Sequence, residues 1–327
     1  MYGAVRTMVN ISKSFSFSCG MIFVLTMSLQ YAIFFNTTWD NNSMGTFVLK
    51  ADCERVDQHF DAALQPPFIN EQDDDTAIII SSGWTKSFPT LYFIKEVMDS
   101  LTHLRGLSLT TPIYIIVDGL GNDDPEKKNQ LDQYVDMLYH EYHHSSRVHL
   151  WINVQNHHVG GTVFKVLHFL QDHYPNIRYI YYLQHDIKFI HAINHTAIHK
   201  TMEQNPGIDI VRFRLHGESS NTACTNHRNL TQPTEGAFLT TNNITLFHTK
   251  KYSDMNHYAR MSYYVGMIDS LGMRKRFPEG PMMNRANEDC FMDGPWLYGT
   301  PSGGPNTILH MDGRQKLVPS MNTTPIN

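Results

Sequence analysis

The chain has 327 residues, of which 26 are Lys or Arg and 31 are Asp or Glu, so its formal net charge is −5. Hydrophobic residues make up 41% of the sequence and charged residues 17%, which excludes an intrinsically disordered chain, a collagen-like repeat and a disulfide-stapled miniprotein. The mild acidity argues against a nucleic-acid partner, because nucleic-acid binders usually present a basic face.

An uncharged run at residues 15–35 is the first feature along the chain. A helix of this length reaches about 30 Å, the thickness of the hydrocarbon core of a bilayer. Arg6 and Lys13 precede the run, and Asp40 is the first charge after it, which places the N-terminus in the cytosol. We expect a cytosolic tail at 1–14, a transmembrane signal-anchor at 15–35, and the remainder in the Golgi or ER lumen. A cleaved signal peptide or a buried helix is the alternative.

A polar stretch at residues 36–75 contains Pro66-Pro67 and shows no sustained periodicity, which predicts a stem that separates the catalytic domain from the membrane. Residues 316–327 are expected to form a C-terminal tail. Six sites with the N-x-Ser/Thr pattern lie beyond the predicted anchor, and they favour a glycoprotein of the secretory pathway: Asn36, Asn41, Asn194, Asn229, Asn243 and Asn322.

Three cysteines would face an oxidising lumen, namely Cys53, Cys224 and Cys290, while Cys19 lies in the predicted anchor. Three cysteines allow at most one intramolecular disulfide, and its pairing cannot be deduced from the sequence. The sequence contains no Cys-x-x-Cys pair, so a structural zinc ribbon is not expected.

Short β-branched runs alternate with helical patterns from residue 76 onward. The predicted strands are 76–82, 113–119, 148–154 and 177–186, and the predicted helices are 89–104, 125–144 and the segment after Gly160-Gly161. This alternation predicts βαβ units, and hence an α/β, Rossmann-like fold with a mostly parallel sheet and helices on both faces. Ligands of such sheets bind at the carboxyl ends of the strands.

The pattern is less regular after residue 186. We expect strands at 209–214, 237–247 and 307–314, a helix at 255–271, loops at 277–287 and 294–306, and a short helix from about residue 288. No internal repeat or second core is evident, so one domain at 76–315 is the simplest interpretation.

Polar residues end two of the predicted strands: Asp118 follows the second, and Gln184-His185-Asp186 closes the fourth. With the order of the elements, this placement resembles the GT-A glycosyltransferases, especially their family-2-like group. The resemblance covers roughly residues 76–314. It implies a GT-A fold and a nucleotide-sugar donor, with Asp118 near the base and ribose and Gln184 as a hydrogen-bonding partner of the ribose.

The same resemblance implies a divalent metal, Mn²⁺ or Mg²⁺. Members of the family usually carry Asp-x-Asp at the end of the fourth strand, and here only Asp186 matches. A hard cation neutralises the charge that develops on a diphosphate leaving group. Several members complete the metal site with a late histidine, and His310 occupies that position.

An acidic pair, Glu288-Asp289, matches the position of the family's catalytic base. We expect Asp289, with Glu288 as the second choice, to accept the proton of the acceptor hydroxyl in an inverting transfer. Gly160 and Gly161 resemble the turn that approaches the donor sugar. The processive signature Gln-x-x-Arg-Trp is absent, which favours transfer of a single sugar to a glycan, glycoprotein or glycolipid. Candidates for stacking on the acceptor are Tyr263, Tyr264, Trp296 and Tyr298.

Two other classes of function stay open. His140-Glu141-Tyr142-His143-His144 satisfies H-E-x-x-H, the pattern in which two histidines on one helix face bind zinc and the glutamate acts as base. Its place at the end of a predicted helix argues against a zinc hydrolase, because a helix C-terminus favours histidines in any case. A non-catalytic protein that binds a sugar or nucleotide on the same fold is the other alternative, since the acidic motif is incomplete.

Overall fold

The computed structural model divides the chain into two compact units, Met1–Gln65 and Pro66–Asn327. Every described residue belongs to the second unit, and the described ranges are 75–83, 90–121, 124–153, 156–215, 223–224, 230, 237–250, 252–253, 255–270, 295–300 and 305–311. Within these ranges no helix has the length and apolar character that a membrane span needs. The predicted anchor and stem lie outside them, apart from Asp75.

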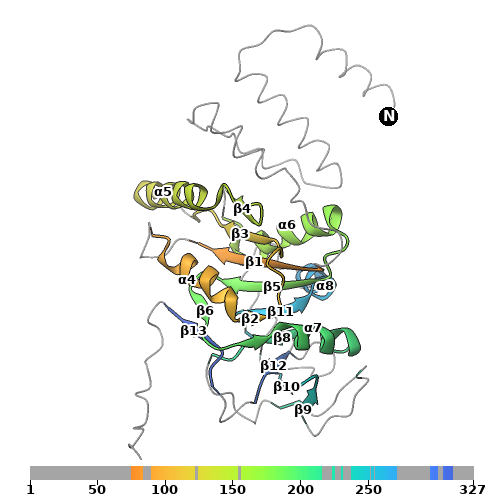
Figure 1. Cartoon of the computed structure of the whole chain (residues 1–327). Helices are drawn as coiled ribbons and strands as arrows, with labels where there is room; N and C mark the ends of the chain where they lie inside the picture. The colour runs from red at the N-terminus through yellow and green to blue at the C-terminus, as the bar shows by residue number, and fades with distance from the viewer. Residues whose placement is uncertain are drawn as a thin grey trace, which may run out of the picture. The chain divides into compact units, whose positions relative to one another are not determined.

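A sheet of nine strands forms the centre of the second unit, in the order β4-β3-β1-β5-β11-β8-β12-β10-β9 (Figure 1). In chain order its strands are β1 (Thr76–Ser82), β3 (Ile113–Val117), β4 (Val148–Ile152), β5 (Tyr179–Gln184), β8 (Ile210–Arg212), β9 (Phe238–Thr241), β10 (Ile244–His248), β11 (His257–Arg260) and β12 (Trp296–Tyr298). Two further pairs join β2 (Leu104–Arg105) to β7 (Ile193–Asn194) and β6 (Ile187–Phe189) to β13 (Ile308–His310).

The first half of the sheet is parallel, as the alternation of strands and helices predicts. β1 pairs with β3 on one side and with β5 on the other, and β3 pairs with β4. The second half is mixed, because β11 runs antiparallel to both β5 and β8, and β10 runs antiparallel to both β12 and β9. The α/β prediction is therefore confirmed, with a sheet that is parallel only over its first four strands and in the β8–β12 pair.

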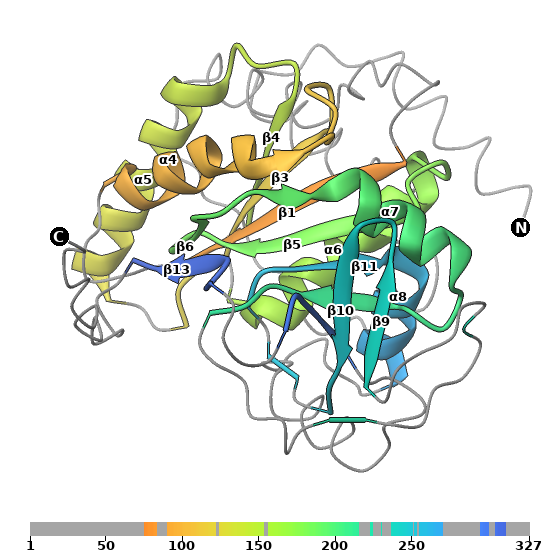
Figure 2. The ribbon, with the colours of Figure 1, turned by 60° about the horizontal axis from the view of Figure 1, so that its bottom comes forward.

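Helices cover both faces of the sheet, as predicted (Figure 2). One face holds α4 (Tyr92–Ser100), α5 (Pro125–Tyr142) and α7 (His195–Gln204), and the 3-10 turn η1 (Leu101–His103) follows α4. The other face holds α6 (His158–His173) and α8 (Met261–Ser270).

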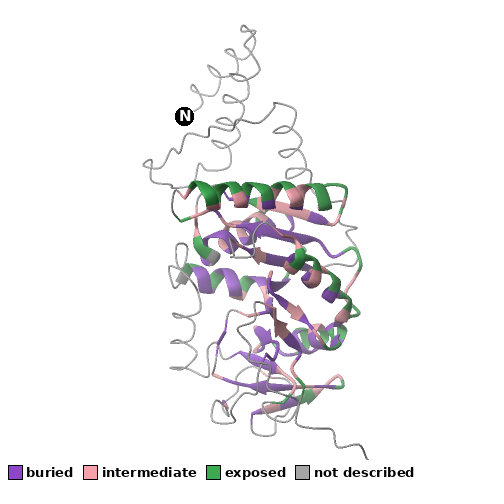
Figure 3. Ribbon diagram, turned by 90° about the vertical axis from the view of Figure 1, so that its left-hand side faces the viewer, coloured by how far each residue is buried: buried purple, intermediate pink, exposed green. Residues whose placement is uncertain are grey.

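Alternate residues of β1 point into the two layers, since successive side chains of a strand face opposite ways. Ile78 and Ile80 pack into the layer of α4 and α5, whereas Ala77 and Ile79 pack into the layer of α6. Figure 3 shows buried residues along the strands and exposed residues on the outer sides of the helices. The middle of β1 is thus buried on both faces, which is why Ala77–Ile80 is a continuous apolar run.

Three sequence-based boundaries are wrong. The strand expected at 237–247 is the hairpin β9–β10, because Asn242 and Asn243 adopt φ values of 49° and 61° and so form the turn that reverses the chain. The helix expected at 255–271 begins with strand β11 and becomes helical only at Met261. The loop expected at 294–306 contains strand β12. The loop expected at 277–287 and the start of the short helix expected from about residue 288 lie outside the described residues.

Because three histidines are largely buried, we expect the fold to lose stability in mild acid. Burial lowers the pKa of His149 and His195 to about 4 and that of His257 to about 3. In the unfolded state a histidine has a pKa of about 6.5. Below that pH the unfolded state binds protons that the folded state does not bind, so the free energy of unfolding falls as the pH drops from about 6.5 toward 4.

We expect His149→Phe to reduce this loss, because Phe can pack on the ring of Tyr114 as the imidazole does, at a centroid distance of 5.1 Å. The difference in unfolding free energy between pH 7 and pH 5 should shrink by about 1–2 kcal/mol relative to the wild type, as measured by urea unfolding of the full-length chain. His144→Phe is the matched control, since His144 is exposed. An unchanged pH dependence in His149→Phe would contradict the assignment.

Candidate functional site

The carboxyl end of β1 lies between the two segments that carry the predicted site residues. The backbone N–H of Asp118 donates to Ser82 O at 3.1 Å, and that of His185 donates to Ser81 O at 3.0 Å. Asp118 and Asp186 therefore follow β3 and β5 at the same edge of the sheet, on opposite sides of β1. Two strand spacings separate their backbones by about 10 Å.

The carboxylate of Asp118 is held by the connection from β4 to α6. Its Oδ1 accepts from the backbone N–H of His157 at 2.9 Å and from Oγ1 of Thr162 at 3.1 Å. Asn153, which directly follows β4, donates from Nδ2 to the same Thr162 oxygen at 3.0 Å. These contacts fix the carboxylate beside the N-terminus of α6, where the helix dipole favours a negative charge.

Lys165 adds a cation to this corner. Its Nζ lies 2.8 Å from Nε2 of His157, and burial lowers the pKa of Lys165 while the charge of Asp118 opposes that shift. His157, Thr162 and Lys165 were not predicted as site residues. The sequence signal for Thr162 is its position near the start of the helix that follows β4, from which its side chain reaches Asp118 at the end of β3.

Asp186 and His310 lie 124 positions apart in the sequence, and the fold brings them together. The antiparallel pairing of β13 with β6 sets His310 opposite Ile187, and Nε2 of His310 lies 3.7 Å from Oδ2 of Asp186. Both side chains are largely buried, with 11% and 13% exposed. A carboxylate oxygen and an imidazole nitrogen at this spacing fit a shared Mn²⁺, since both are suitable ligands for that ion.

Asn256 is a structural residue of this site that sequence reasoning missed. It is completely buried, and its Oδ1 accepts from the backbone N–H of Gln184 at 3.0 Å while its Nδ2 donates to Ile187 O at 2.9 Å. One side chain thus spans the turn that carries Asp186. Gln184 itself is half-buried at the end of β5, on the edge where the resemblance places the ribose.

The remaining predicted residues fall into two groups. Gly160 and Gly161 lie inside the first turn of α6, because the helix begins at His158 and not after the glycines. Both glycines are buried. Glu288 and Asp289 lie outside the described residues, so their roles stay predictions.

Two of the four aromatic candidates for acceptor stacking are wrong. Tyr264 and Trp296 are each 1% exposed and belong to the core. Tyr298 is half-buried and accepts a hydrogen bond from the backbone N–H of Asn194 at 3.3 Å, and Tyr263 is half-buried against the layer of α6 and α8.

The H-E-x-x-H pattern does not form a zinc site in the described structure. α5 ends at Tyr142, so His144 lies beyond the helix. Glu141, the expected base, forms an ion pair with Lys95 at 2.8 Å. Among the described residues, the single group of three or more side chains that could hold a metal contains neither His140 nor His144.

Comparison with known proteins gives structural likeness alone. No family model matches the chain, and no curated protein matches it. TarS 1–349 from S. aureus has a TM-score of 0.39 and 10% identity, over 72% of this chain and 60% of that one. The structure of the same protein in complex with UDP has a TM-score of 0.38 and 8% identity, over 72% of this chain and 59% of that one. Mannosyltransferase PcManGT from Pyrobaculum calidifontis, in complex with GDP-Man and Mn²⁺, gives 0.42 and 8%, over 80% and 65%.

The chain thus covers less than two thirds of each of these structures. A likeness of this strength does not assign a family, so the function has to be argued from the residues of the chain itself.

The two hydrogen bonds by which Asn256 holds the turn between Gln184 and Ile187, here called the Asn256 clamp, lead to a prediction about stability. Asn256→Ala leaves the N–H of Gln184 and the carbonyl of Ile187 without this partner, which should lower the unfolding free energy by about 1–3 kcal/mol. Asn129→Ala, at an exposed position of α5, is the matched control and should change it by less than about 0.5 kcal/mol. Urea unfolding of the full-length chain measures both, and equal effects of the two substitutions would exclude the clamp.

Proposed function

We propose that the protein is a GT-A glycosyltransferase that transfers a single sugar from a nucleotide-diphosphate sugar to an acceptor hydroxyl. The observation that carries the proposal is the approach of His310 to Asp186, at 3.7 Å, on the sheet edge that also holds Asp118. An acidic nucleoside-binding position and a metal-binding pair about 10 Å apart suit the two ends of a nucleoside diphosphate.

Different residues at the carboxyl ends of these strands bind different parts of the donor. Asp118 and Gln184 hydrogen-bond the nucleoside, and the fixed orientation of Asp118 by His157 and Thr162 lowers the entropic cost of that contact. Gly160 and Gly161 lie in the helix turn nearest the donor sugar. Asp186 and His310 would hold Mn²⁺ or Mg²⁺. The chemistry that such an ion would supply is electrostatic stabilisation of the negative charge on the leaving diphosphate.

The transfer is a single displacement with inversion. The bond between the anomeric carbon and the diphosphate oxygen breaks, the acceptor oxygen bonds to the same carbon from the opposite face, and the nucleoside diphosphate leaves. Asp289, or Glu288 in its place, takes the proton of the acceptor hydroxyl. The acceptor is a glycan, glycoprotein or glycolipid.

We further propose a single-pass type II membrane protein with its catalytic domain in the Golgi or ER lumen. The uncharged run at 15–35 and the basic residues before it favour this topology. Cys224 is disulfide-bonded, which is in keeping with an oxidising compartment.

Activity of the full-length chain with UDP- and GDP-sugars in the presence of Mn²⁺ tests the proposal. Asp186→Ala should lower kcat/KM by roughly 100-fold or more, because it removes a ligand of the ion that stabilises the leaving group. Asp172→Ala, at an exposed position of α6, is the matched control and should retain wild-type activity.

Two outcomes would overturn the assignment. Activity that survives both Asp186→Ala and metal chelation would remove the metal site. Binding of nucleotide without transfer to any acceptor would favour the non-catalytic binding protein instead.

A further inference from the structure

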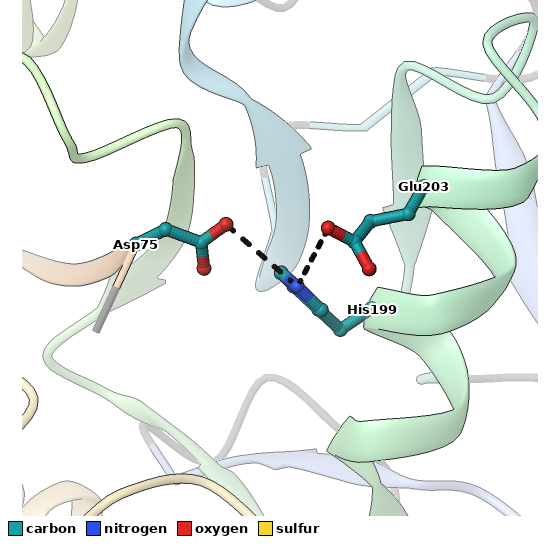
Figure 4. Close-up of side chains that lie close together, drawn as sticks. All are labelled: Asp75, His199 and Glu203. Atoms are coloured by element: carbon teal, nitrogen blue, oxygen red, sulfur yellow. Dashed lines mark ion pairs between the residues drawn. The ribbon is translucent and has the colours of Figure 1, made fainter. Parts of the chain in front are cut away.

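Three potential metal ligands meet at the opposite edge of the sheet. Asp75 immediately precedes β1, and His199 and Glu203 are spaced four residues apart on α7, so that they share one face of that helix. Figure 4 shows the imidazole of His199 between the two carboxylates. Asp75 and the strand end that carries the candidate catalytic site are separated by the length of β1, about 20 Å.

The distances fit a bound ion better than direct hydrogen bonds. Nε2 of His199 lies 3.7 Å from Oδ2 of Asp75 and 3.6 Å from Oε1 of Glu203, beyond hydrogen-bonding range. Ligands at about 2.0–2.1 Å around a tetrahedral zinc ion lie roughly 3.4 Å apart. The side chains of Asp75 and His199 are 23% and 21% exposed, so the cluster is sheltered and still open to solvent.

A buried tyrosine orients the imidazole. The hydroxyl of Tyr258 lies 2.8 Å from Nδ1 of His199 and 3.0 Å from Oγ1 of Thr76. The hydroxyl of Thr76 donates to Oδ1 of Asp75 at 3.3 Å, so the phenol of Tyr258 donates to Thr76 and its oxygen accepts from His199. With Nδ1–H donating to that hydroxyl, the lone pair on Nε2 faces the carboxylates. A fixed tautomer of this kind is the usual outer-shell support of a histidine that ligates a metal.

The guanidinium of Arg178 forms ion pairs with both carboxylates. Nη2 of Arg178 lies 2.5 Å from Oδ2 of Asp75 and 2.9 Å from Oε1 of Glu203, the same two oxygens that face His199. The Arg178 side chain is 57% exposed, so it can swing into solvent. Once Arg178 has moved away, the two carboxylates carry a charge of −2, which favours a divalent ion.

We propose that Asp75, His199 and Glu203 form a binding site for a divalent transition metal, for which Zn²⁺ is the best match, and that Arg178 gives way when the ion binds. Two carboxylates and one imidazole suit zinc, with water as a fourth ligand. The ion would join the residue before β1 to α7, and so fasten the start of the central strand to the helix layer.

Zinc titration of the full-length chain, followed by calorimetry and by thermal unfolding, tests this site with the metal alone. The wild type should bind one more equivalent of Zn²⁺ than His199→Ala or Glu203→Gln, and Zn²⁺ should raise its melting temperature more than theirs. Arg178→Gln should bind Zn²⁺ at least as tightly as the wild type, because the competing cation is gone. Tyr258→Phe should weaken binding by about tenfold through loss of the orienting hydrogen bond.

A double variant, His143→Ala with His144→Ala, controls for zinc captured by exposed histidines. It should bind as many equivalents of Zn²⁺ as the wild type. Glu203→Gln changes a side chain that is 41% exposed, so we expect this variant to keep the fold. Circular dichroism of the variant checks that it does. The same stoichiometry in wild type, His199→Ala and Glu203→Gln would overturn the proposal, as would loss of binding in Arg178→Gln. These readouts do not involve sugar transfer, so their failure leaves the proposed catalytic function intact.

Discussion

The parallel pairing of β1 with β3 on one side and β5 on the other is the constraint on which the candidate site depends. It directs the carboxyl ends of three strands to one edge, where Ser81 and Ser82 accept hydrogen bonds from the residues that follow β5 and β3. The pairing is stable because β1 is buried on both faces by different helix layers. Polar side chains at that edge are therefore brought together by an apolar core.

Strands from the later part of the sequence also position residues of the candidate site. β13 delivers His310 to Asp186 by pairing with β6, and Asn256, just before β11, holds the turn from Gln184 to Ile187. β11 also presents Tyr258 toward the opposite edge, where it contacts His199. β11 and the residue that precedes it thus support both the proposed catalytic edge and the proposed zinc site, which lie at opposite ends of β1.

The first half of the domain could be predicted because its strands are short, buried and separated by periodic helices, so Asp118 and Asp186 stand out as polar residues at strand ends. His310 was predicted through family resemblance alone, since nothing local distinguishes it among 19 histidines. Asn256 and Tyr258 could not be found, because the apolar pattern of 255–271 suits a helix and concealed β11. Asp75 was assigned to the stem, since its partners on α7 follow more than 120 positions later.

Binding of Mn²⁺ in the presence of UDP, measured by electron paramagnetic resonance on the full-length chain, tests the central claim most directly. The measurement is best made in a His199→Ala background, so that the proposed zinc site does not contribute. The account predicts that UDP promotes Mn²⁺ binding and that Asp186→Asn or His310→Ala abolishes this effect. Undiminished nucleotide-dependent binding in both variants would show that these two side chains do not hold the ion.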